Sequence, residues 1–243
     1  MASLYLVPEI SETDAAAGGV IRVTGDEARH AITVARLRVG EHISVGDGAG
    51  LIADGVVTSI AAGDLEVAVH SLRREERPRP ELWLAQALAK GDRDELAIQA
   101  ATELGVSGVI PWQAERSVSR WDGPKAAKGR ERWRSIVREA SKQSIRAWVP
   151  EVAEAADTQA LTRLTGLVLV LEPTASTALT AMPLDDLERI TLVVGPEGGV
   201  SPKELAQLEE VGARAVRLGS EVLRTSTAGP AALAVLNARL GRW

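Results

Sequence analysis

Two apolar runs near the C-terminal end of the sequence, each followed at once by a glycine-containing turn, constrain the fold of this chain most. Residues 190–194 lead into Gly-Pro-Glu-Gly-Gly at 195–199, and residues 213–218 lead into a turn over 219–225. Such runs are typical of buried strands in a parallel sheet. Ligands of open α/β sheets bind beyond the carboxyl ends of these strands. We therefore expect the two turns to line one pocket.

From residue 81 onward, strand-like and helix-like patterns alternate. Further strands are predicted at 82–89, 106–111 and 167–171. Helices are predicted at 92–104, with Leu96, Ala100 and Leu104 on one face, at 125–145, with Trp133, Ile136, Val137 and Ala140 as an inner stripe, at 202–211 after the N-cap Ser201, and at 225–240. This alternation predicts an α/β domain with a parallel sheet.

The region up to about residue 72 is instead rich in short strand patterns. They cover 4–7, 20–23, 42–46, 51–60 and 65–71, separated by Gly and Asp turn signals, and favour a small barrel or sandwich. A short helix is predicted at 25–37. Residues 73–80 are charged and contain two prolines, which is typical of a linker. The predicted organisation is a β domain over 1–72, a linker over 73–80 and an α/β domain over 81–243.

Composition excludes several kinds of chemistry. The 243 residues are 45% hydrophobic and 25% charged, which is ordinary globular balance. There is no cysteine, and only three scattered histidines occur, so disulfides and thiol nucleophiles are excluded and no metal site is expected. The sequence shows no basic and apolar leader and no run long enough to span a bilayer, so a cytoplasmic protein is expected.

Charge is distributed unevenly along the chain. The net charge is −5, yet residues 115–148 hold ten Lys or Arg against four Asp or Glu, a local balance of +6 against −11 elsewhere. A polyanion can bind such a field by releasing its counterions. The alternative is a solvated helix face. Charge alone leaves both open.

The glycine loop at 195–199 brings bare backbone groups close to a ligand. Neither the P-loop pattern nor the dinucleotide-binding Gly-x-Gly-x-x-Gly pattern occurs there. Glu197 would also repel a phosphate. A cofactor that is neutral or cationic at its reactive end therefore fits better, and the alternative is a tight turn that binds nothing.

These residues, taken with others along the chain, carry a family resemblance. The matching positions are Gly195-Pro196-Glu197-Gly198-Gly199, Ser201, Glu204, Leu218-Gly219, Val222-Leu223-Arg224-Thr225 and Thr227-Ala228, and upstream His30, Arg36-Leu37-Arg38, Gly40, Lys90-Gly91-Asp92-Arg93, Gln99-Ala100, Thr102-Glu103-Leu104-Gly105-Val106, Pro111, Glu115-Arg116-Ser117, Arg132-Trp133, Glu139-Ala140, Gln143-Ser144, Arg146 and Pro150. They run nearly end to end. The chain resembles the RsmE family, SPOUT-class methyltransferases of small-subunit ribosomal RNA.

The resemblance implies a fold and an activity. It implies an N-terminal PUA-like β-barrel for RNA binding and a C-terminal α/β domain with a trefoil knot. The implied reaction moves a methyl group from S-adenosylmethionine to N3 of a uridine in the decoding region of 16S rRNA, so 16S rRNA or the small subunit is the expected partner. Family members generally act as homodimers. The apolar last helix, with Ala231, Leu233, Ala234, Leu236 and Leu240, is a candidate for that interface or packs within one subunit.

The resemblance also implies which residues form the cofactor pocket. Three loops would contribute Leu171, Glu172 and Pro173, then Gly195, Glu197, Gly198 and Gly199, then Leu218, Gly219, Val222, Leu223, Thr227 and Ala228. Backbone groups would hold the adenine edge and apolar side chains would flank its faces. The chain departs from the family at Ser226, where Glu is more usual, so a role for that carboxylate does not transfer.

The chemistry of the implied reaction suggests catalytic residues. N3 of uridine must lose a proton, and the charge then spreads to the flanking carbonyl oxygens, which an arginine would stabilise. Arg116 and Arg224 are candidates, each with a structural or phosphate-binding role as the alternative, and Glu197 would position the base, accept the proton or cap backbone N–H groups. RNA contacts are expected at His30, Arg36, Arg38, Arg130 and Arg134.

Two other functions remain open from the sequence. One is a non-catalytic RNA-binding or ribosome-assembly factor on the same fold, for which Ser226 would be a mark of decay. The other is a SPOUT methyltransferase with a different RNA target. Transfer of a methyl group to RNA distinguishes the first, and the position of the modified nucleotide distinguishes the second.

Overall fold

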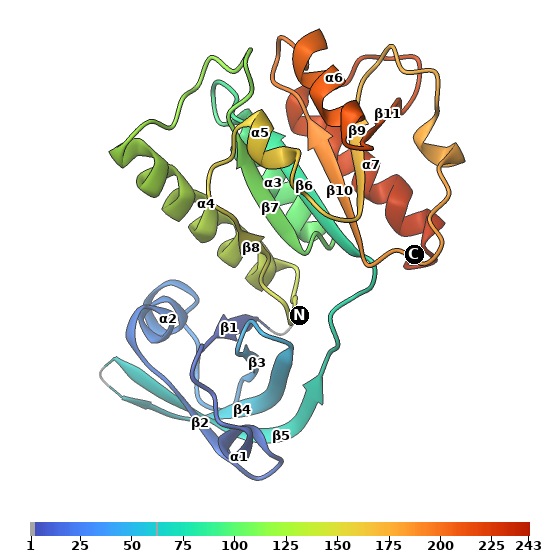
Figure 1. Cartoon of the computed structure of the whole chain (residues 1–243). Helices are drawn as coiled ribbons and strands as arrows, with labels where there is room; N and C mark the ends of the chain where they lie inside the picture. Colours follow the sequence, from blue (N-terminus) through green and yellow to red (C-terminus); the bar gives the residue numbers. More distant parts are fainter. Residues whose placement is uncertain (1–2, 62) are drawn as a thin grey trace. The chain divides into compact units, whose positions relative to one another are not determined.

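The computed structural model describes residues 3–61 and 63–243, and the chain divides into two compact units (Figure 1). Unit 1 contains the chain up to Arg77 together with Ser141–Val149, and unit 2 contains Pro78–Ala140 and Pro150–Trp243. The sequence pattern places 141–149 with the C-terminal domain. This segment instead packs within unit 1, because Ala147 is buried with Leu4, Leu6 and Ile52 and its carbonyl accepts a 3.0 Å hydrogen bond from Gly50 N.

Unit 1 is built on a five-stranded sheet, in agreement with the β-rich prediction. Its elements are β1 (Leu4–Leu6), α1 (Glu12–Ala15), β2 (Val20–Val23), α2 (Gly25–Arg29), the π-helix η1 (His30–Val34), β3 (His42–Gly46), β4 (Leu51–Ala61) and β5 (Asp64–Arg74). The strand order is β1-β3-β4-β5-β2, with only β1 and β3 parallel. Strand β5 extends into the first two residues of the predicted linker.

The larger hydrophobic core of unit 1 has Tyr5, Ile43, Val45 and Leu65 among its buried members. The long β4–β5 pair bends at two register shifts, and Gly55 lies at the first of them. A Cβ atom on Gly55 would lie 2.3 Å from the Ala68 carbonyl oxygen. In the described residues the edge strands β1 and β2 are not paired with each other, so the sheet remains open rather than closing as a hydrogen-bonded barrel.

Unit 2 is a six-stranded sheet, and the prediction that it is parallel is confirmed. Its elements are β6 (Glu81–Ala87), α3 (Arg93–Glu103), β7 (Gly108–Trp112), α4 (Pro124–Gln143, whose last residues belong to unit 1), β8 (Glu151–Val152), α5 (Thr158–Leu161), β9 (Leu167–Leu171), the 3₁₀ helix η2 (Leu179–Ala181), β10 (Arg189–Val194), α6 (Pro202–Glu210), β11 (Arg214–Val216) and α7 (Thr225–Arg239). The strand order is β11-β9-β10-β6-β7-β8. All pairs are parallel.

Helices cover both faces of this sheet. One face presents residues such as Trp83 and Val193, which are buried together with Leu161 of α5 and Leu208 of α6. The next residues along each strand point to the opposite face. There α7 approaches so closely that a Cβ atom on Gly229 would lie 3.0 Å from a methyl carbon of Leu84. The bare backbone of Gly229 therefore permits this close packing of helix on sheet.

Helix α3 forms where it was predicted, but the apolar face predicted for it, with Leu96, Ala100 and Leu104, is not its buried face. Leu96 is 57% exposed, whereas Ala97, Ile98 and Ala101 are fully buried. The reason is that α3 packs against α7, and small side chains allow the two helices to approach. A pattern based on leucines therefore selects the solvent side of this helix.

The other helical predictions are confirmed more closely. On α4, Trp133, Val137 and Ala140 are buried as expected. On α7, Leu233 and Leu236 are completely buried within the chain, so these two side chains pack inside unit 2. Among the described residues, no helix combines the length and the hydropathy needed to cross a membrane.

Candidate active site

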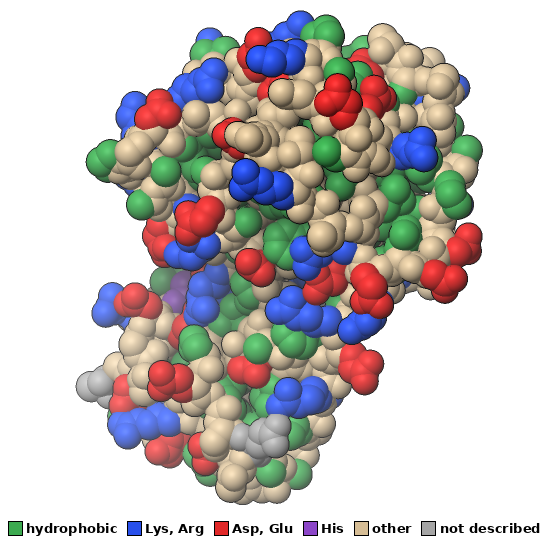
Figure 2. Space-filling model, viewed as in Figure 1, with side chains coloured by type: hydrophobic (Ala, Val, Ile, Leu, Met, Phe, Trp, Pro, Cys, Tyr) green, Lys and Arg blue, Asp and Glu red, His purple; other side chains and the backbone are tan. Residues whose placement is uncertain are grey.

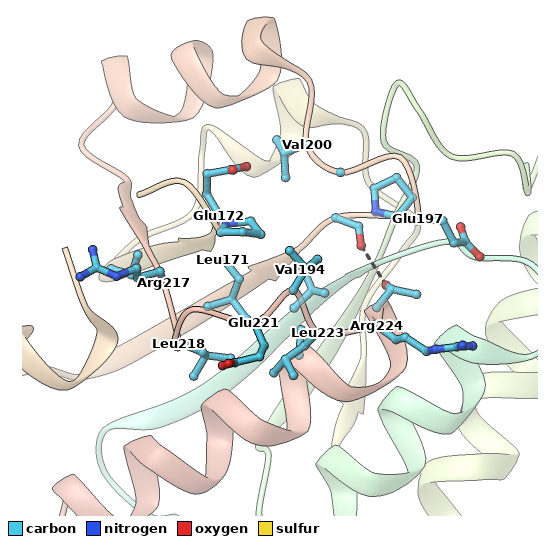
Figure 3. Close-up of a pocket in the computed structure, with 18 of the residues that line it drawn as sticks. Leu171, Glu172, Val194, Glu197, Val200, Arg217, Leu218, Glu221, Leu223 and Arg224 are labelled. Carbon is cyan, nitrogen blue, oxygen red and sulfur yellow. Dashed lines mark hydrogen bonds between the residues drawn. The ribbon is translucent and has the colours of Figure 1, made fainter. Parts of the chain in front are cut away.

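A cavity of about 440 Å³ lies at the carboxyl ends of β9, β10 and β11 and reaches the start of α7 (Figure 3). The prediction that the two glycine turns line one pocket is confirmed. Of the residues expected at a cofactor site, the cavity is lined by Leu171, Glu172, Pro173, Gly195, Glu197, Gly199, Leu218, Gly219, Val222, Leu223 and Ala228. Gly198 and Thr227 are not among the lining residues. Pro196, Glu221 and Thr225, which lie within the two predicted turns, also line the cavity. The sequence did not indicate the further lining residues Arg93, Val194, Val200, Val216 and Arg217.

The loop at 195–200 turns back on itself at the end of β10. Gly199 N donates a 2.9 Å hydrogen bond to the Pro196 carbonyl, and Gly199 adopts a φ of +71°, which favours glycine. A Cβ atom on Gly195 would lie 2.9 Å from Val200 N and 3.1 Å from the Gly199 carbonyl carbon. The loop can fold this tightly because Gly195 has no side chain.

Thr225, the first residue of α7, joins this loop to the centre of the sheet. Its hydroxyl donates a 2.8 Å hydrogen bond to the Gly195 carbonyl and accepts one of 2.8 Å from Gln86 Nε2. Gln86 is fully buried in β6, next to β10. The loop is therefore anchored to the sheet by two buried polar side chains, those of Thr225 and Gln86.

Arg116 holds the same loop from its outer side. Its guanidinium Nη1 donates a 2.9 Å hydrogen bond to the Gly198 carbonyl and a longer one of 3.5 Å to the Val200 carbonyl. A Cβ atom on Gly198 would contact the Arg116 side chain at 3.3 Å. Gly198 therefore faces Arg116 and does not line the cavity. Of the roles that the sequence left open for Arg116, this geometry supports the structural one.

A buried carboxylate fixes the segment that carries Arg116. Glu204 Oε1 accepts hydrogen bonds from Glu115 N at 2.8 Å and from Thr158 Oγ1 at 2.7 Å, while its Oε2 accepts from Ser201 N at 3.1 Å. Ser201 caps α6 and donates to Glu115 Oε2 at 2.7 Å. Burial alone raises the pKa of Glu204, but these hydrogen bonds outweigh it and hold that pKa below its ordinary value. Glu204 thus stays ionised.

Glu197 lies at one end of the cavity and binds the turn before α3. Its Oε1 accepts a 3.1 Å hydrogen bond from Lys90 N and forms a 3.0 Å ion pair with Arg93 Nη1. Burial raises the pKa of Glu197, but hydrogen bonds from its own backbone N–H, from Lys90 and from Arg93 lower it below the ordinary value. A carboxylate with a lowered pKa is a poor proton acceptor, so this geometry favours a positioning role.

The segment at 218–223 forms the opposite wall of the cavity and is bonded very differently. No backbone N–H or C=O of these six residues makes a hydrogen bond within the part of the chain that the structure describes. Val222 and Leu223 are exposed to solvent, Val222 to 77%, and Leu218 is half-buried. These free backbone groups, beside apolar Leu171 and Leu218, suit a flat ligand with a hydrogen-bonding edge.

Arg224 lines the cavity just after this segment. Its side chain is exposed and forms no hydrogen bond or ion pair with any described residue. Figure 3 shows Arg224 and Glu197 on one side of the view, with Glu172 and Arg217 on the other. Arg217 is engaged with the Ala175 carbonyl at 2.8 Å. Arg224 is therefore an unengaged guanidinium at the cavity, in contrast to Arg116.

The residues expected to contact RNA fall into two groups. In unit 1, Arg36 and Arg38 are exposed with no side-chain partner among the described residues, and His30 is half-buried in η1. In unit 2, Arg130 Nε donates to the Val152 carbonyl at 3.0 Å, and its Nη1 pairs with Glu154. Arg134 is exposed and pairs with Glu131 at 3.4 Å.

The basic stretch is consequently less of a continuous field than its composition suggests. Lys142 is buried and paired with Glu27 at 3.2 Å, and burial lowers the pKa of Arg146 to about 10. Arg132 makes two-pronged contacts with Glu95. Figure 2 shows basic and acidic side chains interspersed on the face in view. Many of these cations therefore serve the fold.

Comparison with known proteins decides the family. The profile of the RNA methyltransferase domain matches residues 75–237, and that of the RNA methyltransferase PUA domain matches residues 23–69. Ribosomal RNA small subunit methyltransferase E of Mycobacterium bovis is 42% identical over 100% of this chain and 94% of its own length. The chain belongs to the RsmE family.

Solved structures of similar proteins agree with this assignment. The RsmE protein of Neisseria gonorrhoeae, crystallised with S-adenosylmethionine, superimposes with a TM-score of 0.87 at 28% identity and covers 98% of both chains. A putative methyltransferase from Legionella pneumophila, also with bound S-adenosylmethionine, gives 0.88 at 28% identity and 98% of both chains. The α/β domain and PUA domain implied by the RsmE resemblance are thus confirmed.

Proposed function

We propose that this chain transfers a methyl group from S-adenosylmethionine to N3 of a uridine in the decoding region of 16S rRNA. The observation that carries the proposal is the cavity at the ends of β9, β10 and β11, which combines apolar walls with six residues of unbonded backbone. Full-length relatives named for methylation of small-subunit ribosomal RNA support the substrate class.

The residues present fit S-adenosylmethionine. The unbonded N–H and C=O groups at 218–223 would bind the edge of the adenine, and Leu171, Leu218 and Leu223 would flank its faces. The volume of about 440 Å³ lies within the range of small-molecule sites. When bound, S-adenosylmethionine supplies an electrophilic methyl group. The acidic Glu172 and Glu221 suit a cofactor with positive charge.

The protein side chains then act on the uridine. Loss of the N3 proton to solvent leaves negative charge on N3 and on the two neighbouring carbonyl oxygens. Arg224, exposed at the cavity and without a protein partner among the described residues, would donate hydrogen bonds to such an oxygen and favour the ionised base. Glu197 holds the turn at Lys90 and Arg93, and Arg116 holds the glycine loop, so both act by positioning. Alignment of N3 with the methyl group supplies the rest of the rate.

Further parts of the proposal concern recognition and assembly. His30, Arg36 and Arg38, with Arg130 and Arg134, would contact RNA, and the exposed guanidinium groups of Arg36 and Arg38, unpaired within the described chain, best support this. The RsmE resemblance supports a trefoil knot within 81–243 and a homodimer. The exposed Val222 and Leu223 offer apolar surface for a second subunit beside the cavity. Action on ribosomal subunits implies a cytoplasmic enzyme.

The test is methyl transfer to small ribosomal subunits that lack this modification. Labelled S-adenosylmethionine is supplied, and the product nucleoside and its position are identified by mass spectrometry. The proposal expects N3-methyluridine at a single decoding-region position. A different methylated nucleoside, or binding of S-adenosylmethionine without transfer, would contradict it, and the second result would favour an assembly factor.

A further inference from the structure

A second cavity, of about 400 Å³, lies in unit 2 beside the turn that precedes α3. It is lined by this turn and by Trp121, Gly129 and Trp133, so it is distinct from the cavity at the sheet ends. The two cavities share one structural element. Lys90 lines the second cavity, while Glu197, which accepts a hydrogen bond from Lys90 N, and Arg93, which follows the turn, line the first.

The turn between the cavities is fixed from both sides. Gly91 and Asp92 both adopt left-handed backbone conformations, with φ of +62° and +59°, and the second is unfavourable for a residue with a side chain. Glu197 accepts from Lys90 N at 3.1 Å on one side, and buried Asp94 accepts from Ala89 N at 3.3 Å on the other. Strained backbone that persists in this way is typical of functional sites.

Aromatic side chains form another wall of the second cavity. The rings of Trp121 and Trp133 meet edge to face, with centroids 5.3 Å apart. Trp121 lies over Gly129 of α4, where a Cβ atom would be 2.4 Å from the indole ring. A bare helix surface is therefore what lets Trp121 lie at this position.

The same wall contains an unsatisfied donor. Trp133 is fully buried, and its Nε1–H meets no acceptor in the described residues, although nearly all buried N–H groups are bonded. A ligand with a carbonyl oxygen would satisfy this donor after neighbouring side chains shift. Trp133 lines the same cavity, and its Nε1–H is covered by neighbouring atoms.

The charges at the cavity select among ligands. The Lys90 ammonium group is exposed and has no side-chain partner among the described residues. Arg132 and Glu95 neutralise each other at 2.8 Å, and both Asp94 oxygens are occupied by backbone N–H groups. Asp92 also lines the cavity, and its exposed carboxylate interacts electrostatically with Arg132. An aromatic wall, an acceptor-seeking indole and a cation at the rim match an RNA nucleotide, with a flat ring, carbonyl groups and a phosphate.

We propose that the second cavity binds the base of an unstacked nucleotide of the substrate RNA, a neighbour of the uridine that is methylated. Trp121 stacks on this base, and Lys90 contacts its phosphate. The inference rests on the proposed function, because it takes RNA as the substrate. Through the shared turn, a nucleotide held here also fixes Glu197 at the edge of the cofactor cavity.

The test measures binding of a short fluorescein-labelled single-stranded RNA that carries the target uridine and its neighbours, by fluorescence anisotropy with the full chain. Trp121→Ala is expected to raise the Kd for this RNA by between about fivefold and about a hundredfold, the usual range for loss of one base–aromatic stack. Trp121→Phe should retain most of the affinity because it keeps an aromatic face. The Kd for S-adenosylmethionine, measured by calorimetry, should not change.

Trp243→Ala is the matched control, because Trp243 is 69% exposed and lines neither cavity. Unchanged RNA affinity in Trp121→Ala would overturn the inference, as would equal losses in Trp121→Phe and Trp121→Ala or no RNA binding by the native chain. Should Trp121→Ala fail to fold, Lys90→Gln decides. Lys90→Gln is expected to lower the slope of log Kd against log salt concentration by about one, because one phosphate contact is lost. An unchanged slope would overturn the inference.

The proposed function fails separately. A native chain that binds this RNA through Trp121 but transfers no methyl group would contradict the proposed reaction and leave the nucleotide site standing. Transfer at the expected uridine with normal RNA affinity in Trp121→Ala would do the reverse.

Discussion

The two loops that line the main cavity differ sharply in how they are held. The loop at 195–200 is fixed at its Gly195 carbonyl by Thr225, at its Gly198 carbonyl by Arg116 and at Glu197 by Lys90 and Arg93. The segment at 218–223 makes no backbone hydrogen bond in the described residues. One wall of the cavity is thus rigid before any ligand binds, and the other keeps its hydrogen-bonding groups for a ligand.

This difference assigns separate tasks to the two walls. A rigid wall fixes the position of a bound cofactor, as precise methyl transfer requires. We expect the unbonded wall to adapt to the cofactor and to recognise it through its backbone groups. Substitutions in the first wall should therefore lower the stability of the fold, whereas those in or next to the second should change binding or catalysis alone.

The largest effect is expected at Arg224, which follows the unbonded segment. Arg224→Gln should lower kcat for methyl transfer by about a hundredfold, the loss typical for one donor to a developing oxyanion. Its melting temperature should equal that of the native chain, because the side chain has no protein partner among the described residues. Single-turnover methyl transfer to unmodified small subunits measures the rate, and calorimetry measures the melting temperature.

Arg224→Lys is the control for this prediction. It keeps the positive charge, so partial recovery of kcat is expected. A full pH profile of kcat checks that this recovery does not come from a shift in the pH optimum. A change in KM for the subunit with kcat intact would instead show that Arg224 binds phosphate, which is the role that the sequence left open.

The next largest effect should arise at Gly195 in the rigid wall. Gly195→Ala places a methyl group 2.9 Å from Val200 N, while the hydrogen bond from Thr225 holds the Gly195 carbonyl in place. We expect the free energy of unfolding to fall by about 2 kcal/mol, the usual cost of overpacking. Urea denaturation measures this change. A fully stable variant would show that the loop is not rigid.

A smaller and pH-dependent effect is expected at Glu204. Its folded-state pKa is lowered from an ordinary value of 4.5, so its stabilising contribution is complete above that value and is lost as pH falls through the folded-state pKa. Glu204→Gln should lower the free energy of unfolding at neutral pH by about 1.5 kcal/mol, since an amide N–H would oppose a donor. Denaturation curves between neutral pH and about pH 3 should show the difference between the two proteins shrinking with acid.

Local patterns in the sequence predict much of this site. The apolar runs at 167–171 and 190–194, with the glycine turns that follow the strands, indicate where the cavity lies. Ser201 is predicted as an N-cap, and it forms a capping box with Glu204. Backbone-determined features of this kind depend on residues close in the chain, so a single sequence can reveal them.

Contacts between distant residues are beyond that kind of inference. Arg116 and Gly198 meet across 82 positions of sequence, and Arg93 and Glu197 across 104. Nothing in local periodicity distinguishes Arg116, which is bound to a carbonyl, from Arg224, which is free in the described structure. Both arginines match the RsmE sequence pattern. This match indicates that both positions matter, but it does not indicate which role each arginine has.

Packing between helices explains the wrong face on α3 in the same way. Its inner side consists of Ala97, Ile98 and Ala101 because α7 lies against it, and the sequence of α3 alone does not contain that neighbour. The placement of 141–149 in unit 1 likewise depends on Leu4 and Ile52, far away in the chain. Tertiary partners decide both outcomes.

The smallest effect should come from the unbonded wall itself, and it tests the comparison most directly. A Cβ atom on Gly219 would have Glu221 Oε2, at 3.7 Å, as its nearest neighbour, which is ordinary contact. Gly219→Ala should therefore change the free energy of unfolding by less than about 0.5 kcal/mol, as is usual at open surface sites. It is the matched partner of Gly195→Ala, since both add one methyl group to a cavity wall.

Hydrogen exchange completes the test: amides at 218–223 should exchange fast in the free protein and slowly with S-adenosylmethionine, because only the ligand gives them partners. Slow exchange in the free protein would mean that this wall is as rigid as the other.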